Sequence, residues 1–283
     1  MHRFLLHDGV IQPSAERSVS PGQTGFMNGW GVFSTLRVAR GVLFAFERHW
    51  ARMRKDAELM RVPFPADPEM FRRDLIRLVE ANQAWESTLR VAVVRNRGGM
   101  FEGEGIERDS STIAFTAPSN QWGEGVHLTV EPQARHSACR FTGAKITSWS
   151  HNLTWLDRAK EAGFDEVILL NERGEVAECT SANIFLEKDG VMATPPLSAG
   201  CLPGVTRELL LGDAKPAGCA VVERPLTLDE IFTADAVYVT STTRDLLPVL
   251  SVQHRPLSRS GSLGDSFKKS FIAYVDAYVT SRV

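Results

Sequence analysis

Several features that would assign the chain to a specialised class are absent from its sequence. It has 283 residues with 32 Lys and Arg against 34 Asp and Glu, a formal net charge of −2, so it carries no positive excess for binding nucleic acid. It contains 4 cysteines and no CxxC pair, which argues against a disulfide framework and against a zinc site. We therefore expect free thiols and no structural metal.

Long hydrophobic runs are also lacking. The first twenty residues contain no apolar stretch behind a basic start, which predicts neither a signal peptide nor a membrane-spanning helix. With 43% hydrophobic and 23% charged residues, the composition is typical of a packed globular chain. Together these absences predict a cytoplasmic protein without a nucleic-acid or membrane partner.

Local patterns predict strands and helices that alternate irregularly along the chain. Asp8-Gly9 between apolar residues is a hairpin signal, and Val32–Phe46 alternates around an Ala-Arg-Gly turn. Apolar residues recur at spacings of three and four over Glu47–Met60, which predicts a helix, and a second helix is expected to reach Ala84. The mixture without a strict βαβ rhythm favours an α+β, mixed-sheet fold over a barrel or a Rossmann sheet.

The segment SNQWGEG, residues 119–125, has no periodic pattern and separates two strand-like runs. It is the predicted interdomain linker, between a small N-terminal α/β domain (1–118) and a larger C-terminal domain (126–283). Further strands and helices are expected in the second domain, among them a helix that Thr227 caps and a final amphipathic helix through Tyr274.

One of the seven lysines has unusual surroundings. Lys145 is the only formally charged residue between Phe141 and Leu156, whereas the other lysines lie in charged or turn segments. Loss of hydration lowers the pKa of a lysine, and a neutral amine attacks aldehydes to form a Schiff base. Lys145 is therefore a candidate nucleophile, and the alternative is a lysine that reaches solvent from an edge strand.

Two further segments are suited to holding phosphate oxygens. Pro203 and Gly204 precede a predicted helix from Val205, and the N–H groups of a helix start attract anions. The run Thr240–Thr243 at the end of a strand supplies hydroxyl donors. Ordinary helix capping and an exposed strand end are the alternatives. Together with Lys145, these are the parts needed to hold pyridoxal 5'-phosphate (PLP).

The sequence resembles the class IV aminotransferases, the fold type IV PLP enzymes that include branched-chain aminotransferases, D-amino-acid aminotransferases and aminodeoxychorismate lyases. The matching stretches, in family order, are GFMNGWGVFSTLR, FERHWARM, Lys145 with the stretch from His151 to Arg207, and AVYVTSTTRDLLPV. The resemblance implies a two-domain fold with the active site between a small N-terminal and a larger, PLP-binding C-terminal domain.

The resemblance also implies roles for individual residues. Lys145 would be the Schiff-base lysine and the base that moves a proton between the substrate α-carbon and the cofactor. Glu178 would pair with the pyridine nitrogen, and Arg52 would bind the phosphate. The other implied cofactor contacts are Ser181, Leu202, Gly204, Val205, Thr206, Ser241 and Thr242.

The substrate pocket follows the family less closely. Branched-chain members have a tyrosine where this chain has Ser150, and a Tyr-x-Arg where it has Thr88-Leu89-Arg90, so a branched-chain substrate is in doubt. Ser34 replaces a glutamate of many transaminases, which brings this stretch nearer to the lyases. The candidate substrate contacts are Phe33, Arg37, Arg90, Arg95, Arg97 and Thr243. Arg97, in a glycine-rich loop, ranks slightly ahead of Arg90 as the carboxylate clamp.

We therefore expect a PLP-dependent aminotransferase that moves an amino group from an amino acid to a 2-oxo acid. The alternative is an aminodeoxychorismate lyase, which converts 4-amino-4-deoxychorismate to 4-aminobenzoate and pyruvate and needs no second keto acid. Substrate identity and L or D stereochemistry stay open. The resemblance implies a homodimer with a shared active site, for which the apolar GFMNGWGVF loop is suited, and closure of the monomer's own core is the alternative use of that loop.

Overall fold

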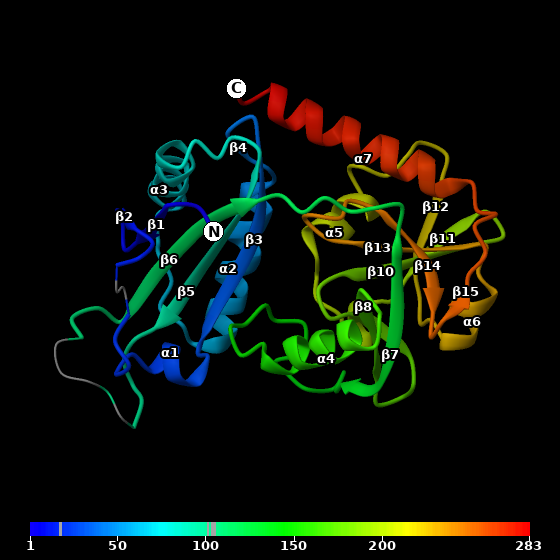
Figure 1. The fold of residues 1–283 in the computed structure, drawn as a ribbon, viewed down its shortest axis with the longest axis horizontal. Helices are drawn as coiled ribbons and strands as arrows, with labels where there is room; N and C mark the ends of the chain where they lie inside the picture. Colours follow the sequence, from blue (N-terminus) through cyan, green and yellow to red (C-terminus); the bar gives the residue numbers. More distant parts are fainter. Residues whose placement is uncertain (17–18, 101, 103–105) are drawn as a thin grey trace. The chain divides into compact units, whose positions relative to one another are not determined.

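The structure is a computed structural model that describes residues 1–16, 19–100, 102 and 106–283 (Figure 1). The chain divides into two compact units: unit 1 contains Met1–Asn120, Ala144–Trp149 and Ala277–Val283, and unit 2 contains Gln121–Gly143 and Ser150–Asp276. The predicted linker 119–125 spans the point at which unit 2 begins. None of the described helices combines the length and the hydrophobicity needed to cross a membrane.

Unit 1 is built on a six-stranded antiparallel sheet with the strand order β2-β1-β6-β5-β3-β4. Its strands are β1 (Phe4–His7), β2 (Val10–Pro13), β3 (Gly31–Ala39), β4 (Val42–Leu43), β5 (Ser87–Arg95) and β6 (Ser110–Pro118). The predicted Asp-Gly hairpin is confirmed, because Asp8 and Gly9 have φ angles of 49° and 84°, as a turn that matches the strand twist requires.

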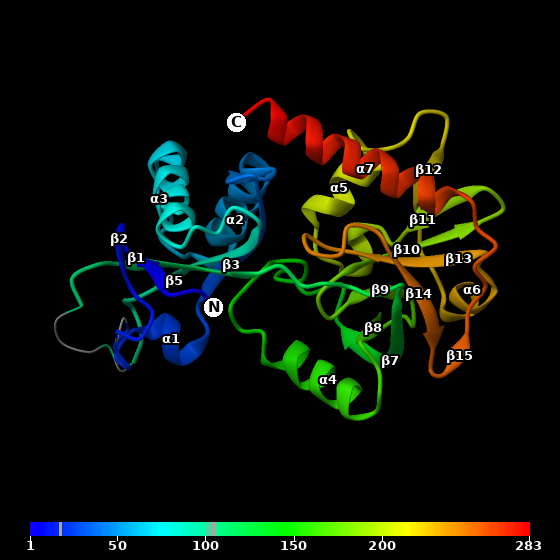
Figure 2. The same cartoon turned by 45° about the horizontal axis from the view of Figure 1, so that its top comes forward.

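Three helices accompany this sheet: α1 (Thr24–Asn28), α2 (Phe46–Met60) and α3 (Pro68–Ala81). Helix α2 packs on β3 and α3 packs on β1 and β6, and Figure 2 shows both on one side of the sheet. Trp50, Met53 and Ala57 of α2 are buried, as their spacing predicted. Helix α3 ends before the predicted Ala84, because Gln83 adopts a left-handed φ of 51° that stops the helix.

Unit 2 contains a nine-stranded mixed sheet, with the order β12-β11-β10-β13-β14-β7-β8-β9 and with β15 paired to β14. Its strands are β7 (Val126–Arg135), β8 (Glu166–Asn171), β9 (Val176–Cys179), β10 (Asn183–Lys188), β11 (Val191–Thr194), β12 (Ala220–Glu223), β13 (Ala236–Thr240), β14 (Leu247–Val252) and β15 (Arg255–Pro256). Parallel pairs join β11 to β12, β14 to β7 and β7 to β8. The predicted mixed-sheet, α+β fold is confirmed.

The helices that begin in unit 2 are α4 (Ser150–Glu161), the 3-10 turn η1 (Leu197–Ala199), α5 (Val205–Leu211), α6 (Leu228–Thr233) and α7 (Leu263–Thr280). Thr227 caps α6 as predicted, in a reciprocal capping box with Glu230. Three strands were not predicted. β9 has 4 residues and β15 has 2, which gives too short a pattern, and β14 contains Pro248, which lacks a backbone donor.

Lys145 belongs to unit 1, which differs from the predicted boundary at residue 126. The Phe33 N–H donates to the Lys145 carbonyl at 3.0 Å, the Thr147 N–H donates to the Gly31 carbonyl at 2.9 Å, and Ile146 bridges to Val32. These bonds attach residues 144–149 to the edge of β3. Such an attachment depends on strand pairing between distant segments, which no local pattern records.

Candidate active site

Lys145 lies against two aromatic rings of unit 1. Its Nζ is 4.5 Å from the centroid of Phe33 and 5.6 Å from that of Trp149, and the two rings meet edge to face at 5.9 Å. Its backbone N–H donates to Asp56 Oδ2 at 3.1 Å. The main chain and the two rings therefore fix where the amine lies.

A polar cluster from β3 and α2 lies beside Lys145 in unit 1. Arg52 Nη2 donates to Ser34 Oγ at 2.8 Å, and Ser34 Oγ is also 2.8 Å from His49 Nδ1. Burial lowers the pKa of His49 well below its ordinary value, and the charges of Arg52 and Lys145 lower it further. Burial raises the pKa of Asp56, against the opposing effects of the Lys145 N–H and of the same two charges. The structure thus brings the predicted residues Arg52 and Lys145 into one electrostatic neighbourhood.

Two of the predicted substrate residues, Phe33 and Arg90, lie on the face of the unit 1 sheet opposite to Ser34 and α2. Side chains alternate along a strand, and Phe33 pairs with Ala92 while Thr35 pairs with Arg90. The Arg90 guanidinium lies 4.5 Å from the Phe33 centroid, and burial lowers the pKa of Arg90. Phe33 therefore contacts both Arg90 and Lys145.

Arg95 and the residues after it form a turn at the end of β5. The Arg95 guanidinium lies 4.6 Å from the centroid of the Trp30 ring, and its Nη1 donates to the Arg61 carbonyl at 2.6 Å. Arg95 thus joins three segments of unit 1 to one another. Part of the glycine-rich loop that the sequence singled out, Phe101 and residues 103–105, lies outside the described residues.

Arg97 is an exposed residue that lies close to two protein carboxylates. It lies 3.6 Å from a carboxylate oxygen of Glu102 and 3.7 Å from one of Asp109, and its Nε donates to the Ile106 carbonyl at 3.0 Å. Arg37 lies half-buried on β3, and the Thr88 that pairs with it belongs to β5. Of the four arginine candidates, Arg90 is the one whose guanidinium shares a ring with Lys145.

In unit 2, Glu178 is a buried residue of β9 whose two oxygens each have a protein partner. Arg135 Nε, at the end of β7, donates to Oε1 at 3.0 Å, and the Leu202 N–H donates to Oε2 at 3.0 Å. Arg135 Nη2 donates to Asn152 Oδ1 at 3.2 Å, on α4. These partners orient the carboxylate. Sequence reasoning missed Arg135 and Asn152, and no spacing marks them.

Ser181 belongs to a second buried group of unit 2. Its hydroxyl and that of Thr180 donate to the fully buried carboxylate of Glu166. Arg244 Nη2 donates to the same carboxylate at 3.0 Å, and the Arg244 guanidinium lies 4.3 Å from the centroid of Trp122. Ser181 is therefore held by this ion pair, and its predicted approach to the pyridine ring stays a prediction. Glu166 and Arg244 were not anticipated from the sequence.

The turn before α5 and the first turn of the helix carry four of the predicted cofactor residues. Gly204 is the N-cap of the helix, and no side chain caps it. Asn183 Nδ2 donates to the Leu202 carbonyl at 2.9 Å, and a Cβ on Gly204 would collide with Asn183 Oδ1. Val205 and Thr206 form the buried first turn, where N–H groups have no partner within the helix.

Ser241, Thr242 and Thr243 form a turn directly after β13. The N–H groups of Arg244 and Asp245 both donate to the Ser241 carbonyl at 3.2 Å, and the hydroxyls of Ser241 and Thr243 are 3.5 Å apart. Strand β13 ends at Thr240, so the hydroxyl run predicted at a strand end is in fact a compact turn of half-buried side chains.

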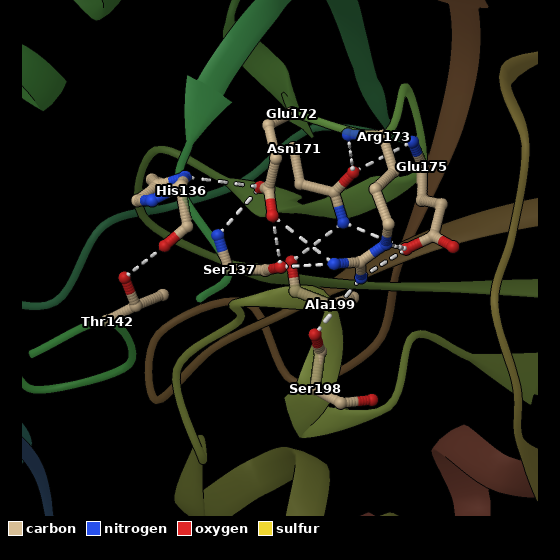
Figure 3. A network of polar contacts seen from close by, with 9 residues as sticks. All are labelled: His136, Ser137, Thr142, Asn171, Glu172, Arg173, Glu175, Ser198 and Ala199. Carbon is tan, nitrogen blue, oxygen red and sulfur yellow. Dashed lines mark hydrogen bonds and ion pairs between the residues drawn. The ribbon is translucent and has the colours of Figure 1, made fainter. Parts of the chain in front are cut away.

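A polar network in unit 2 joins Ser137 to the segment from Asn171 to Glu175 (Figure 3). The backbone N–H and the hydroxyl of Ser137 each donate to Glu172 at 2.7 Å, and Arg173 Nη2 donates to Glu175 at 2.6 Å. The bonds from Ser137 lower the pKa of Glu172 to about 2. The segment after β7 is thereby tied to the turn that leads into β9.

The family profile described as "Amino-transferase class IV" matches residues 31–252. The chain belongs to the class IV aminotransferases. Among curated relatives of this aminotransferase, a D-alanine aminotransferase of Bacillus licheniformis is 28% identical over 92% of either chain. A branched-chain-amino-acid aminotransferase of Pseudomonas aeruginosa is 28% identical over 87% of this chain and 84% of its own.

Solved structures of the family share the fold of this aminotransferase. The branched-chain aminotransferase of the archaeon Thermoproteus uzoniensis, solved with norvaline, has a TM-score of 0.88 at 24% identity, covering 98% of this chain and 96% of that one. A Legionella pneumophila chain assigned as a 4-amino-4-deoxychorismate lyase has a TM-score of 0.84 at 23% identity, covering 94% and 97%. The fold alone therefore does not separate transaminases from lyases.

The residues present suit a pyridoxal phosphate cofactor. Unit 1 of this aminotransferase supplies an amine on Lys145 and a guanidinium on Arg52. Unit 2 supplies an oriented carboxylate on Glu178 and the uncapped first turn of α5, whose N–H groups can donate to a phosphate. Within the described ranges, no group of three or more His, Cys, Asp or Glu side chains is arranged to hold a metal ion.

Proposed function

We propose that this class IV aminotransferase binds PLP through Lys145, Arg52 and Glu178 and transfers an amino group between an amino acid and a 2-oxo acid. When bound, PLP supplies the carbonyl that takes up the amino group and a ring that withdraws electrons. The observation that carries the proposal is that Lys145 and Arg90 both contact the ring of Phe33 in unit 1.

Lys145 is the proposed nucleophile and proton carrier. With the cofactor bound, Nζ would accept the proton from the α-carbon of the substrate and donate it to the former carbonyl carbon of the cofactor, so the same amine would act as base and then as acid. The contacts with Phe33 and Trp149 support this role, because the two rings hold the amine in one place.

Glu178 is the proposed partner of the pyridine nitrogen. A carboxylate oxygen has two acceptor positions, so Oε1 and Oε2 retain capacity after accepting from Arg135 and from the Leu202 N–H. Held between these donors, Glu178 stays in one orientation and can keep a proton on the nitrogen. Arg135 acts on the reaction through Glu178 and is therefore a positioning residue.

Phosphate binding is assigned to Arg52 and to two segments of unit 2. The first comprises Gly204, Val205 and Thr206, where the N–H groups of Val205 and Thr206 at the uncapped helix start suit an anion, with Leu202 packing on the ring. The second comprises the hydroxyls of Ser241 and Thr242. Ser181 is retained as a contact of the cofactor ring by resemblance to the family.

Arg90 is the proposed clamp for the substrate carboxylate, ahead of Arg37, Arg95 and Arg97. Its guanidinium is partly desolvated, it contacts the Phe33 ring, and no described carboxylate lies within ion-pair distance of it. Burial of an unpaired charge is unfavourable, so a carboxylate from a ligand stabilises this site. Arg97, by contrast, has Glu102 and Asp109 beside it. Thr243 is the proposed hydroxyl contact of the same carboxylate.

A homodimer with shared active sites is the proposed assembly. In α1, within the glycine-rich apolar loop, Phe26 is 56% exposed and Met27 is 67% exposed. Two adjacent large apolar side chains on the surface are suited to burial against a second copy of the chain. Light scattering tests this proposal, and a catalytically active monomer at assay concentration would exclude it.

The test of the function is a set of half-reactions. PLP-loaded protein is mixed with single L-amino acids, D-amino acids and simple amines in the absence of a keto acid, and the cofactor spectrum is followed. We expect at least one amino acid to convert the cofactor to its pyridoxamine form, and Lys145→Ala is the matched control that does not. If every donor fails while 4-amino-4-deoxychorismate yields pyruvate, the enzyme is a lyase.

A further inference from the structure

Ser34 and His49 form a buried polar pair on the core side of the unit 1 sheet. Ser34 is 0% exposed and His49 is 2% exposed, and their Oγ and Nδ1 atoms are 2.8 Å apart. Ser34 lies on β3, and His49 lies on the face of α2 that also carries Arg52, one turn further on. Buried polar groups destabilise a fold unless they form hydrogen bonds, so each polar atom of the pair needs a donor or an acceptor.

The hydrogen bonds of this pair have one consistent arrangement. An arginine side chain only donates, so the 2.8 Å contact between Arg52 Nη2 and Ser34 Oγ uses a lone pair of the serine. Ser34 then has one proton to donate, and in the described part of the chain its hydroxyl has no acceptor other than His49 Nδ1. His49 is held neutral by burial and by the neighbouring positive charges, so Nδ1 accepts and the ring proton is on Nε2.

This arrangement ties the Arg52 guanidinium to the sheet. A free arginine side chain rotates about four bonds, so its guanidinium can point in many directions. A hydrogen bond from Nη2 to a buried strand residue restricts this rotation and fixes the plane of the guanidinium. The Ser34 hydroxyl is itself fixed, because its proton is directed at His49. The buried residues Ser34 and His49 thus set the direction in which the Arg52 guanidinium points.

We infer that Ser34 and His49 are positioning residues for a phosphate group: the His49–Ser34 pair holds Arg52 in the orientation in which it binds the phosphate of the cofactor. The inference rests on the proposed function, in which Arg52 contacts that phosphate. It assigns a task to Ser34, which stands where many transaminases have a glutamate, and to His49, a residue that the reaction itself does not use.

A purely structural role for the pair predicts a different outcome. If Ser34 and His49 only joined α2 to β3, their loss would weaken the binding of PLP and of pyridoxal, which lacks the phosphate, to the same extent. If they position Arg52, their loss weakens the binding of PLP and spares that of pyridoxal. The ratio of the two dissociation constants therefore separates the two roles without any measurement of activity.

The experiment compares four variants with the wild type by titrating PLP and pyridoxal against absorbance. Ser34→Ala and His49→Leu remove the anchor, and His49→Asn retains an acceptor near the position of Nδ1. Ser87→Ala is the matched control, because Ser87 is a similarly buried serine of unit 1 whose hydroxyl donates to the Ala84 carbonyl at 2.8 Å. Thermal unfolding shows whether each variant is folded.

We expect Ser34→Ala and His49→Leu to lose about tenfold or more of the preference for PLP over pyridoxal, as for the loss of a hydrogen bond to a charged group. His49→Asn should recover most of it, and Ser87→Ala should keep all of it. Equal losses for both ligands, or no change in the ratio, would overturn the inference while leaving the proposed function intact. A wild type that binds neither ligand would overturn both.

A second measurement keeps the inference testable if Ser34→Ala does not fold. Nitrogen NMR of the wild-type histidines reports which ring nitrogen carries the proton. We expect His49 in the neutral form with the proton on Nε2 and with Nδ1 as a hydrogen-bond acceptor. A ring protonated at Nδ1 would make Ser34 the acceptor of both contacts and would remove the basis for the inference.

Discussion

Two arginines, one in each unit, stack on an aromatic ring in almost the same way. Arg90 lies 4.5 Å from the centroid of Phe33, and Arg244 lies 4.3 Å from the centroid of Trp122. They differ in whether a protein carboxylate pairs with them. Arg244 is 3.0 Å from the buried carboxylate of Glu166, whereas Arg90 has no described carboxylate within ion-pair distance. A ring contact therefore does not reveal the task of an arginine, whereas the presence of a protein carboxylate distinguishes a structural arginine from one suited to a ligand.

The same contrast extends to the residues around each arginine. In unit 2, Arg135 and Arg207 also pair with carboxylates, those of Glu178 and Glu223. In unit 1, Lys145 and Arg90 share a ring, and Arg52 is anchored on a serine. We therefore expect substitutions in the unit 1 group to affect ligand binding and chemistry, and those in the unit 2 ion pairs to affect stability, with Glu178 as the residue that belongs to both.

The largest expected effect is that of Lys145→Ala on turnover. The loss should exceed about 10⁴-fold, the upper range of a single general base, because the same amine is also the nucleophile. The unfolding midpoint should change little, since the backbone bonds that attach residues 144–149 to β3 stay in place. Borohydride reduction of the PLP-loaded wild type should place pyridoxyl on Lys145 in peptide mass spectrometry, and a label on any other lysine would refute the assignment.

Arg244→Ala should produce the largest loss of stability. It leaves the Glu166 carboxylate, which is 0% exposed, without its partner, and breaking a buried ion pair typically costs about 3–5 kcal/mol. Denaturant unfolding measures the change. The double variant Arg244→Met, Glu166→Gln is the control and should be less destabilised than the single one. If the single and the double variant lose the same free energy of unfolding, the unpaired charge on Glu166 is not the cause of the loss.

Glu178→Gln tests the residue that belongs to both groups. Turnover should fall by about 10²–10³-fold, because a neutral amide does not hold a proton on the pyridine nitrogen as a carboxylate does. Binding of PLP should be largely retained. Rates are measured at matched cofactor occupancy, which the absorbance spectrum reports. Near-normal turnover at full occupancy would show that the carboxylate is structural, like that of Glu166.

Arg90→Met sharpens the comparison from the side of unit 1. The Michaelis constant for amino acids should rise by about 10–100-fold, the size expected for loss of a charged hydrogen-bonded contact, while reaction with simple amines stays the same. Its effect on unfolding should be small, because no described protein carboxylate loses a partner. Ala substitutions at Arg37, Arg95 and Arg97 are the controls. Wild-type kinetics for Arg90→Met and for all three controls would assign the carboxylate to backbone and hydroxyl donors instead.

The smallest expected effect is a pH dependence in the network of Figure 3. The pKa of Glu172 is lowered from 4.5 to about 2 in the folded chain, chiefly by the backbone and side-chain bonds from Ser137. A depressed pKa stabilises the fold above the unfolded value, and this contribution is lost as pH falls toward 2. Ser137→Ala should therefore be slightly less stable than the wild type at neutral pH, with a difference that shrinks below pH 4.5. A constant difference across that range would show that the bonds do not depend on the charge.

Much of the fold was predictable because local patterns encode it. The three- and four-residue spacing in α2, the Asp-Gly turn of β1 and β2, and the Thr227 cap each depend on residues within a few positions of one another. Family motifs, which are also contiguous, marked Lys145, Glu178 and Arg52. Strands β9 and β14 were missed because one is short and the other contains proline.

Only the tertiary structure decided which charged residues meet. Arg135 and Glu178 are 43 residues apart, and Glu166 and Arg244 are 78 residues apart, so sheet register rather than sequence spacing joins them. The same is true of Lys145, which pairing with β3 places in unit 1. The sequence by itself determined most of the elements and the family, and it marked the candidate side chains. Register and burial decided which arginine has a carboxylate, because desolvation and ion pairing depend on neighbours that are distant in the chain.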